Sequence, residues 1–224
     1  MSSKKKNKTR LGILLSGGGR TMVNIAEEIT AGNLDAEIAT VVSSRSNVAG
    51  VERARELGFR PHVIRKKDYP DVAEFSKRIY EALDADDVNL VLQCGWLCLW
   101  EIPLRYEYRV MNIHPALLPA FPGTDGYGDT FRYGCKVGGC TVHFIDYGED
   151  SGPIIGQKTF AISEDDTIET IRAKGLELEW QLYPECVQLF AQKRLAVIKQ
   201  SYHAENGLIK NREIVRILPD ASKN

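Results

Sequence analysis

The 224-residue sequence lacks the features that mark several large classes of protein. No apolar run approaches the roughly 20 residues that a membrane-spanning helix needs, and no apolar core follows the basic residues near the N-terminus as it would in a signal peptide. The formal net charge is −1 and the isoelectric point is about 6.4, so the overall charge gives the chain no electrostatic attraction to nucleic acid or to an anionic membrane. We therefore expect a cytoplasmic protein that binds small-molecule substrates rather than nucleic acid or membrane. A homodimer is left open.

The cysteines lack the pattern of a disulfide framework and of a zinc site. The five residues are Cys94, Cys98, Cys135, Cys140 and Cys186. An odd number without a signal peptide favours reduced thiols, and no two of them have Cys-x-x-Cys spacing. We expect small buried packing residues and no metal.

Short apolar stretches alternate with helical stretches from Leu11 onwards. Strands are expected at residues 11–15, 36–42, 61–64 and 88–93, with helices at 21–31, 48–57 and 72–83 between them. This order predicts a parallel sheet with helices on both faces. Further strands are expected at 108–113, around 141–145 and at 154–160, followed by a long helix from about Thr167, where Ser163–Thr167 supplies capping residues.

The predicted fold class is therefore α/β, a single three-layer domain with a mostly parallel twisted sheet. We expect this domain to cover residues 11–200. Residues 1–10 are predicted to form a disordered basic tail, because Lys4–Arg10 is basic and polar. Residues 201–224 are predicted to form a C-terminal appendage, with an edge strand near 214–218.

Two polar side chains stand at the end of the strand expected at 108–113. Asn112 and His114 are two residues apart, so they lie on one face of that strand, and Pro115 then ends the sheet pairing. The carboxyl ends of strands are where open α/β sheets bind ligands. An amide beside an imidazole can hydrogen-bond an oxygen that gains negative charge, or transfer a proton near neutral pH. A polar strand end with satisfied hydrogen bonds remains the alternative.

A second element strengthens the case for a site. The strand around 141–145 runs into a turn with Asp150 followed by Ser151-Gly152-Pro153. A carboxylate near the imidazole would favour its charged form, which suits an anionic partner. His143, on the strand itself, is either a buried structural histidine or a supporting functional residue.

The stretch Ser16–Thr21 is a glycine-rich loop between a strand and a helix. Backbone N–H groups in such a loop form an anion cradle. A dinucleotide site is the nearest rival, but the third glycine of its Gly17-x-Gly19 pattern would fall on Met22. Arg45 at the end of the second strand could bind a 2′-phosphate, so the case for an NADP site is weakened but not excluded. A tight turn without a ligand also stays open.

These motifs together resemble the folate-dependent formyltransferases. The residues that carry the resemblance are Asn112-Ile113-His114-Pro115, Leu117-Leu118-Pro119, Pro122-Gly123 and Asp150-Ser151-Gly152-Pro153. It extends from about Leu11 to about Phe190. It implies a Rossmann-like domain that transfers a formyl group from 10-formyltetrahydrofolate to the amine of glycinamide ribonucleotide in purine synthesis, with no metal.

The resemblance also implies roles for particular residues. The implied catalytic residues are Asn112, His114 and Asp150, with His143 in support. The implied substrate-binding residues are Gly17, Gly18, Gly19, Arg20, Thr21, Pro115 and Glu179, although Glu179 could equally be a solvated helix carboxylate. The implied folate-binding residues are Leu97, Leu99, Trp100, Ile145, Asp146, Tyr147, Gly148 and Glu149.

The chain departs from the family pattern around the expected acceptor pocket. The departures are Cys98 in place of an arginine, Asp125 and Tyr127 in place of histidines, Leu176 in place of a Lys or Gln, and Arg20-Thr21 in place of Ser-Asn. Arg20 could compensate by binding phosphate directly. The acceptor therefore remains open between glycinamide ribonucleotide and another amine, such as an amino-sugar nucleotide. A non-catalytic relative that binds folate or a nucleotide is a further alternative.

Overall fold

The computed structural model describes residues 8–205 and 208–220 of the chain. The chain divides into two compact units, Met1–Met111 and Asn112–Asn224. The boundary falls inside strand β5, Val110–His114. No helix among the described residues has both the length and the apolarity to cross a membrane.

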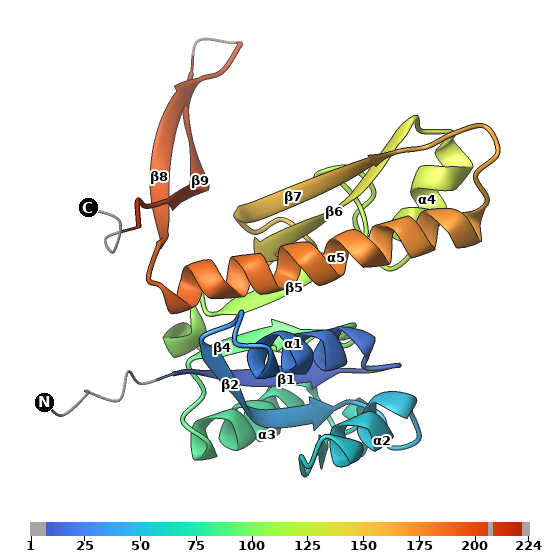
Figure 1. Ribbon diagram of the computed structural model, residues 1–224. Helices are drawn as coiled ribbons and strands as arrows, with labels where there is room; N and C mark the ends of the chain where they lie inside the picture. The colour runs from blue at the N-terminus through green and yellow to red at the C-terminus, as the bar shows by residue number, and fades with distance from the viewer. Residues whose placement is uncertain (1–7, 206–207, 221–224) are drawn as a thin grey trace, which may run out of the picture. The chain divides into compact units, whose positions relative to one another are not determined.

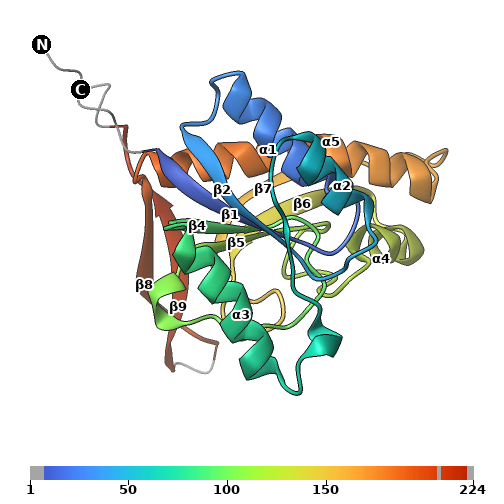
Figure 2. The same ribbon diagram turned by 90° about the horizontal axis from the view of Figure 1, so that it is seen from below.

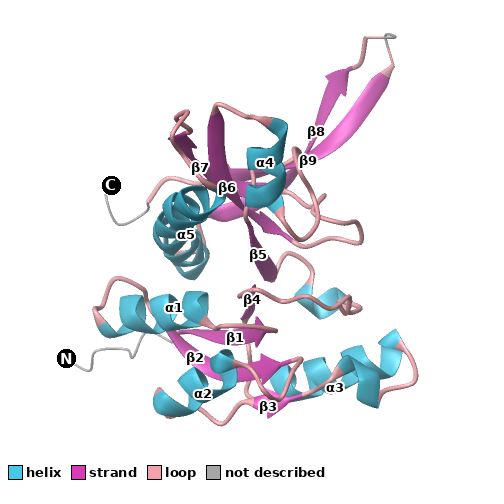
Figure 3. Ribbon diagram, turned by 90° about the vertical axis from the view of Figure 1, so that its right-hand side faces the viewer, coloured by secondary structure: helices cyan, strands magenta, loops and turns pink. Residues whose placement is uncertain are grey.

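The first unit is a parallel sheet with helices on both faces. Its strands are β1 (Thr9–Leu15), β2 (Ala36–Ser43), β3 (His62–Val63) and β4 (Leu90–Gln93), and its helices are α1 (Arg20–Thr30), α2 (Ala49–Glu56) and α3 (Val72–Ala85), with single 3₁₀ turns at Lys66–Asp68 and Leu104–Tyr106. The strands lie in the order β3-β2-β1-β4 and pair in parallel. Figure 3 shows α1 and α2 on one face and α3 on the other. This confirms the α/β fold predicted from the alternation of strands and helices.

The register of this sheet brings the loops after β1, β2 and β4 to one edge. Leu15 is paired with Ser43, and Leu14 with Gln93, so the three strands end side by side. Just beyond β1, the buried hydroxyl of Ser16 accepts hydrogen bonds from Ser44 Oγ at 2.6 Å and from the Leu97 backbone N–H at 2.9 Å. That hydroxyl therefore ties the three loops together at the carboxyl edge, where parallel sheets bind ligands.

The second unit is built from an antiparallel strand pair, a long helix and a hairpin. Its elements are the end of β5, α4 (Gly126–Tyr133), β6 (Val137–Phe144), β7 (Ile154–Ala161), α5 (Ile168–Ala191), β8 (Leu195–His203) and β9 (Ile209–Ile217). β6 is adjacent to both β5 and β7 and runs antiparallel to β7. Helix α5 lies along β6 and β7, and the β8–β9 hairpin follows it (Figure 1). As predicted, α5 begins with a capping residue, Thr167, whose side chain accepts from the Thr170 N–H.

Three elements differ from the expectations. Helix α4 was not predicted, because its sequence holds two glycines and little apolar periodicity; close packing selects it, since a Cβ on Gly126 would lie 2.6 Å from the Pro115 carbonyl oxygen. The single edge strand expected near 214–218 is one arm of a hairpin, and the other arm, β8, crosses residue 200. β1 begins at Thr9, inside the stretch expected to be a disordered tail, whereas residues 1–7 lie outside the described residues.

Candidate active site

Four polar side chains from two strands and one loop meet in the second unit. Asp150, in the loop after β6, has one oxygen 3.3 Å from His114 Nδ1 and the other 3.6 Å from His143 Nε2. His143 Nε2 is in turn 3.3 Å from Asn112 Nδ2. The two histidine side chains are 2% and 0% exposed and that of Asp150 is 12% exposed, so little water screens the charges. The structure thus brings together the three predicted catalytic residues and His143.

The two ring nitrogens of His114 have different partners. His114 Nε2 lies 2.8 Å from the Phe121 carbonyl oxygen, which can only accept, so Nε2 carries a hydrogen. Nδ1 then faces a carboxylate oxygen of Asp150. If both were unprotonated, two lone pairs would oppose each other at 3.3 Å. The contact is therefore favourable when His114 is a charged imidazolium paired with the Asp150 carboxylate, or when the pair shares that proton.

His143 has the opposite character. Its Nδ1 lies 3.0 Å from the Phe144 carbonyl oxygen and so donates to it. Burial is the main cause that lowers the pKa of His143 below 6.5, so the ring is neutral and Nε2 is an acceptor. That nitrogen accepts one N–H of the Asn112 amide. His143 therefore fixes which way the amide of Asn112 points and uses only one of its two N–H groups.

Backbone in a rarely occupied conformation supports the cluster. Phe121 and Asp150 both have positive φ, 53° and 50°, a region that costs non-glycine residues on the order of 1–3 kcal/mol. The strain at Phe121 accompanies the bond from its carbonyl to His114, and Asp150 is the partner of both histidines. Asp150 Oδ2 also accepts the Gly123 N–H at 2.8 Å. The Pro-rich segment after β5 and the loop after β6 are thus fastened to each other at the site.

A buried hydroxyl holds the start of the Pro-rich segment. Thr141 Oγ1, on β6, donates to the Ala116 carbonyl oxygen at 2.7 Å and accepts from the Leu118 N–H at 3.0 Å. The side chain of Gln157 on β7 donates both to this hydroxyl and to the Leu118 carbonyl oxygen. Every hydrogen-bonding site of the Thr141 hydroxyl is used, so the chain leaving His114 is fixed against β6.

The glycine loop in the first unit has the geometry of a tight strand-to-helix turn. Gly19 has φ +70° and forms the N-cap of α1, and a Cβ there would lie 2.7 Å from the Cα of Gly50. Arg20 is exposed and Thr21 is buried at the first turn of the helix. The loop leaves backbone N–H groups at a helix N-terminus, which suits an anion.

The predicted folate-binding residues occupy two loops. Leu97 and Leu99 are exposed, Leu99 at 84%, whereas Trp100 is 9% exposed. In the loop after β6, Tyr147 is 91% exposed, and Asp146 Oδ1 accepts from the Gly148 N–H and from Ser151 Oγ. Leu99 and Tyr147 thus offer apolar surface, and Asp146 shapes the second loop.

Glu179 on α5 is buried rather than solvated. Its Oε1 accepts a hydrogen bond of 2.7 Å from the hydroxyl of Tyr127 on α4, one of the departures from the family pattern. Burial is the largest cause that raises the pKa of Tyr127, followed by the charge of Glu179, so Tyr127 acts as a neutral donor. A Cβ on Gly175 would meet the Tyr127 ring, so this pairing depends on glycine at position 175.

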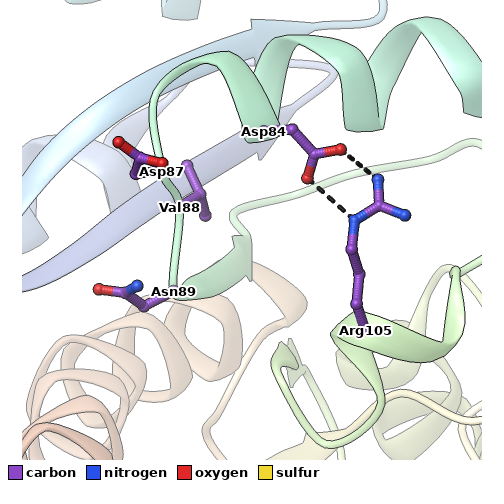
Figure 4. Close-up of a pocket in the computed structure, with 5 residues that line it drawn as sticks. All are labelled: Asp84, Asp87, Val88, Asn89 and Arg105. Carbon is purple, nitrogen blue, oxygen red and sulfur yellow. Dashed lines mark hydrogen bonds and ion pairs between the residues drawn. The ribbon is translucent and has the colours of Figure 1, made fainter.

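A separate hollow in the first unit carries no comparable chemistry. It is lined by Asp84, Asp87, Val88, Asn89 and Arg105, at the beginning of β4 rather than at its carboxyl end (Figure 4). Arg105 already binds the carboxylate of Asp84 with two N–H groups, and this bond raises the pKa of Arg105. Among the described residues, no three His, Cys, Asp or Glu side chains gather in a way that could hold a metal ion.

Sequence reasoning missed the backbone groups and the buried hydroxyl. The Phe121 carbonyl and the Gly123 N–H carry no side-chain signal, because any residue supplies them. Thr141 was part of a predicted strand, but a threonine there is an ordinary strand residue. The only hint was the Pro-rich composition of the segment after His114, which indicates a fixed, irregular path.

Comparisons with known proteins identify the family of this chain. Residues 9–187 match the sequence profile of the family described as Formyl transferase. The phosphoribosylglycinamide formyltransferase of Bacillus subtilis (strain 168) is 37% identical over 181 residues, which cover 80% of this chain and 93% of that protein.

Solved structures give the same result. The crystal structure of glycinamide ribonucleotide transformylase 1 from Symbiobacterium toebii matches with a TM-score of 0.85 and 35% identity, covering 98% of both chains. That of phosphoribosylglycinamide formyltransferase from Bacillus halodurans has a TM-score of 0.79 and 33% identity over 82% of this chain and 96% of that one. The resemblance inferred from the motifs is confirmed, and the chain belongs to the formyl transferase family.

Proposed function

We propose that this chain transfers a formyl group from 10-formyltetrahydrofolate to the amine of glycinamide ribonucleotide, a step of purine synthesis. The observation that carries the proposal is the buried cluster of Asn112, His114 and Asp150, with distances of 3.3 Å between His114 and Asp150 and between Asn112 and the supporting His143. The relatives above, named for this activity, support the acceptor and the reaction.

The cluster suits the chemistry of formyl transfer. When the amine attacks the formyl carbon, the formyl oxygen gains negative charge and needs donors placed in advance. Asn112 provides the N–H that His143 leaves unused. His114 provides its Nε2–H after that group leaves the Phe121 carbonyl oxygen for the substrate. Both groups act in a site with little water, where such bonds are strongest.

Proton transfer falls to the pair of His114 and Asp150. The attacking amine must lose a proton and the leaving nitrogen must gain one. The carboxylate stabilises the charged imidazole while the oxyanion exists; His114 then gives one proton to the leaving nitrogen and regains one from the attacking amine, so the pair ends the reaction with the proton it began with. No covalent nucleophile is required. The buried thiols fit this view, because burial raises the pKa of Cys140 and of Cys186 to about 12, which makes them poor nucleophiles.

The acceptor and the donor are assigned to separate loops. The glycine loop Gly17–Thr21 would bind the phosphate of the acceptor, with Arg20 adding a charged contact. Glu179, held by Tyr127, and Pro115 would contact the rest of the acceptor. The loops that hold Leu97, Leu99 and Trp100 and residues 145–149 would bind the pteridine of the folate, using backbone groups and apolar side chains.

Steady-state kinetics test the proposal. The purified protein is assayed for tetrahydrofolate release from 10-formyltetrahydrofolate with glycinamide ribonucleotide, with an amino-sugar nucleotide, and with no acceptor. We expect stimulation by glycinamide ribonucleotide alone, and loss of that stimulation in an Asn112→Ala control. If neither amine stimulates release, the proposed function fails. If only the sugar amine does, the chemistry stands and the acceptor is wrong.

A further inference from the structure

Two consecutive carbonyl groups of the glycine loop are bound by helix α2. The Gly17 carbonyl oxygen accepts the Gly50 backbone N–H at 3.0 Å. The next carbonyl oxygen, that of Gly18, accepts Nη1 of Arg53, one turn further along α2. The loop is therefore held from one side by a backbone donor and by a guanidinium.

These bonds fix the direction of the N–H groups that could bind an anion. In a planar trans peptide the C=O and the following N–H point in opposite directions. With the Gly17 carbonyl held by Gly50, the Gly18 N–H points away from that donor. With the Gly18 carbonyl held by Arg53, the Gly19 N–H points away from the guanidinium. The Arg53 bond thus sets the orientation of the last peptide before the helix.

Close packing shows that the loop and α2 meet without space between them. A Cβ on Gly50 would lie 2.7 Å from the Gly17 carbonyl oxygen, and a Cβ on Gly19 would lie 2.7 Å from the Cα of Gly50. The packing fixes where the loop lies. Gly18 is exposed, and the nearest atom to a Cβ placed on it is Arg53 Nη1, at 3.5 Å. Arg53 is therefore the side chain placed to hold the Gly18 peptide through its carbonyl oxygen.

We propose that Arg53 is a positioning residue for the phosphate of the acceptor: by holding the Gly18 carbonyl, it keeps the Gly19 N–H directed toward the bound phosphate. The inference rests on the proposed function, in which Gly17–Thr21 binds that phosphate. It assigns a role to a residue outside the loop and outside the resemblance motifs. A guanidinium is suited to the task, because its planar donors stay in place at little entropic cost.

Helix α2 supplies a matched control, Arg55. It lies on the same helix, carries the same charge and is bonded to Glu52 instead of to the loop. The variants Arg53→Met and Arg55→Met are compared for binding of ribose 5-phosphate by calorimetry, which needs no turnover. We expect Arg53→Met to weaken binding about tenfold, the factor that corresponds to one ordinary hydrogen bond, and Arg55→Met to leave it within about twofold.

Kinetics and salt separate positioning from simple charge attraction. The KM for glycinamide ribonucleotide should rise about tenfold in Arg53→Met, with kcat and the KM for the formyl donor nearly unchanged. The difference in ribose 5-phosphate affinity between the two variants should persist from about 0.05 to 0.5 M salt, because screening removes the attraction of a partly exposed charge but leaves peptide orientation unaffected. A difference that vanishes at high salt would overturn the positioning role.

The binding measurements can also overturn the role proposed for Arg53. Equal affinity of the two variants for ribose 5-phosphate would overturn the proposal, as would absence of binding by the wild type. Should Arg53→Met fail to fold, Arg53→Lys and Arg55→Lys are compared by the same criterion, since lysine keeps the charge but loses the planar fork. A wild type that binds ribose 5-phosphate but does not formylate glycinamide ribonucleotide would refute the proposed function while the comparison at Arg53 still stands.

Discussion

Replacing Asp150 with asparagine removes one charge from the site and little else. The amide oxygen can occupy the position of Oδ2, where it still accepts the Gly123 N–H and faces His114 Nδ1. The amide nitrogen then takes the place of Oδ1, 3.6 Å from His143 Nε2. Because shape and most hydrogen bonds survive, any loss of rate reports the charge of the carboxylate rather than a collapsed site.

The size of the effect follows from the distance. Two unit charges 3.3 Å apart attract by about 5 kcal/mol at an effective dielectric constant near 20. The amide dipole recovers part of it, so the charged form of His114 should lose roughly 1.5–3 kcal/mol of stabilisation. If His114 is charged in the transition state, kcat should fall about 10- to 100-fold, since each 1.36 kcal/mol is a factor of ten.

The assay is the steady-state rate with saturating substrates. We expect Asp150→Asn to lower kcat about 10- to 100-fold. The KM values should change little, because ground-state contacts are kept. An unchanged kcat would refute the pairing of His114 with a negative Asp150.

Four further outcomes are expected from substitutions at other points. Asn112→Ala should lower kcat by about 10²–10³ with little change in KM, measured by steady-state kinetics, because one oxyanion donor is lost. Arg20→Ala should raise the KM for the phosphorylated acceptor and leave the KM for the folate unchanged. Thr167→Ala should cost about 1 kcal/mol in urea unfolding without affecting kcat, because it removes the cap of α5. Burial lowers the pKa of His143, so below about pH 6.5 the unfolded chain takes up a proton that the folded chain does not. The free energy of unfolding should therefore decrease as the pH falls. Urea unfolding at pH 7 and pH 5.5 should show a smaller decrease for His143→Gln than for the wild type.

The elements with strong periodicity could be predicted from the sequence, and the weakly patterned ones could not. β1, β2 and α3 were expected within a few residues of where they lie, because apolar spacing alone specifies them. Helix α4 carries Gly126 and Gly128, so its intrinsic preference is poor and only packing against the chain after His114 explains it. Strand β8 and the first half of β9 were not predicted, because most of both strands is exposed and their pattern is polar and mixed.

The candidate site also has features that the sequence predicts and features that it does not. Asn112, His114 and Asp150 could be proposed from the sequence, because their side chains are reactive groups that follow or end predicted strands and belong to the motifs of the resemblance. The contact of His114 Nε2 with the Phe121 carbonyl oxygen could not be predicted, because a carbonyl has no sequence signature. The buried state of Glu179 was likewise hidden, since its partner Tyr127 lies on the helix that was not predicted.

Two imidazoles face one carboxylate, and their other contacts differ. Burial is the largest cause that lowers the pKa of His143, and the Asp150 carboxylate and the Phe144 carbonyl only partly offset it, so His143 serves as the acceptor that orients Asn112. His114 lies between the Phe121 carbonyl oxygen and the Asp150 carboxylate, so it is the imidazole placed to exchange a proton with a substrate. Formyl transfer moves one proton from the attacking amine to the leaving nitrogen, and under the proposed function the single pair of His114 and Asp150 is sufficient to carry it.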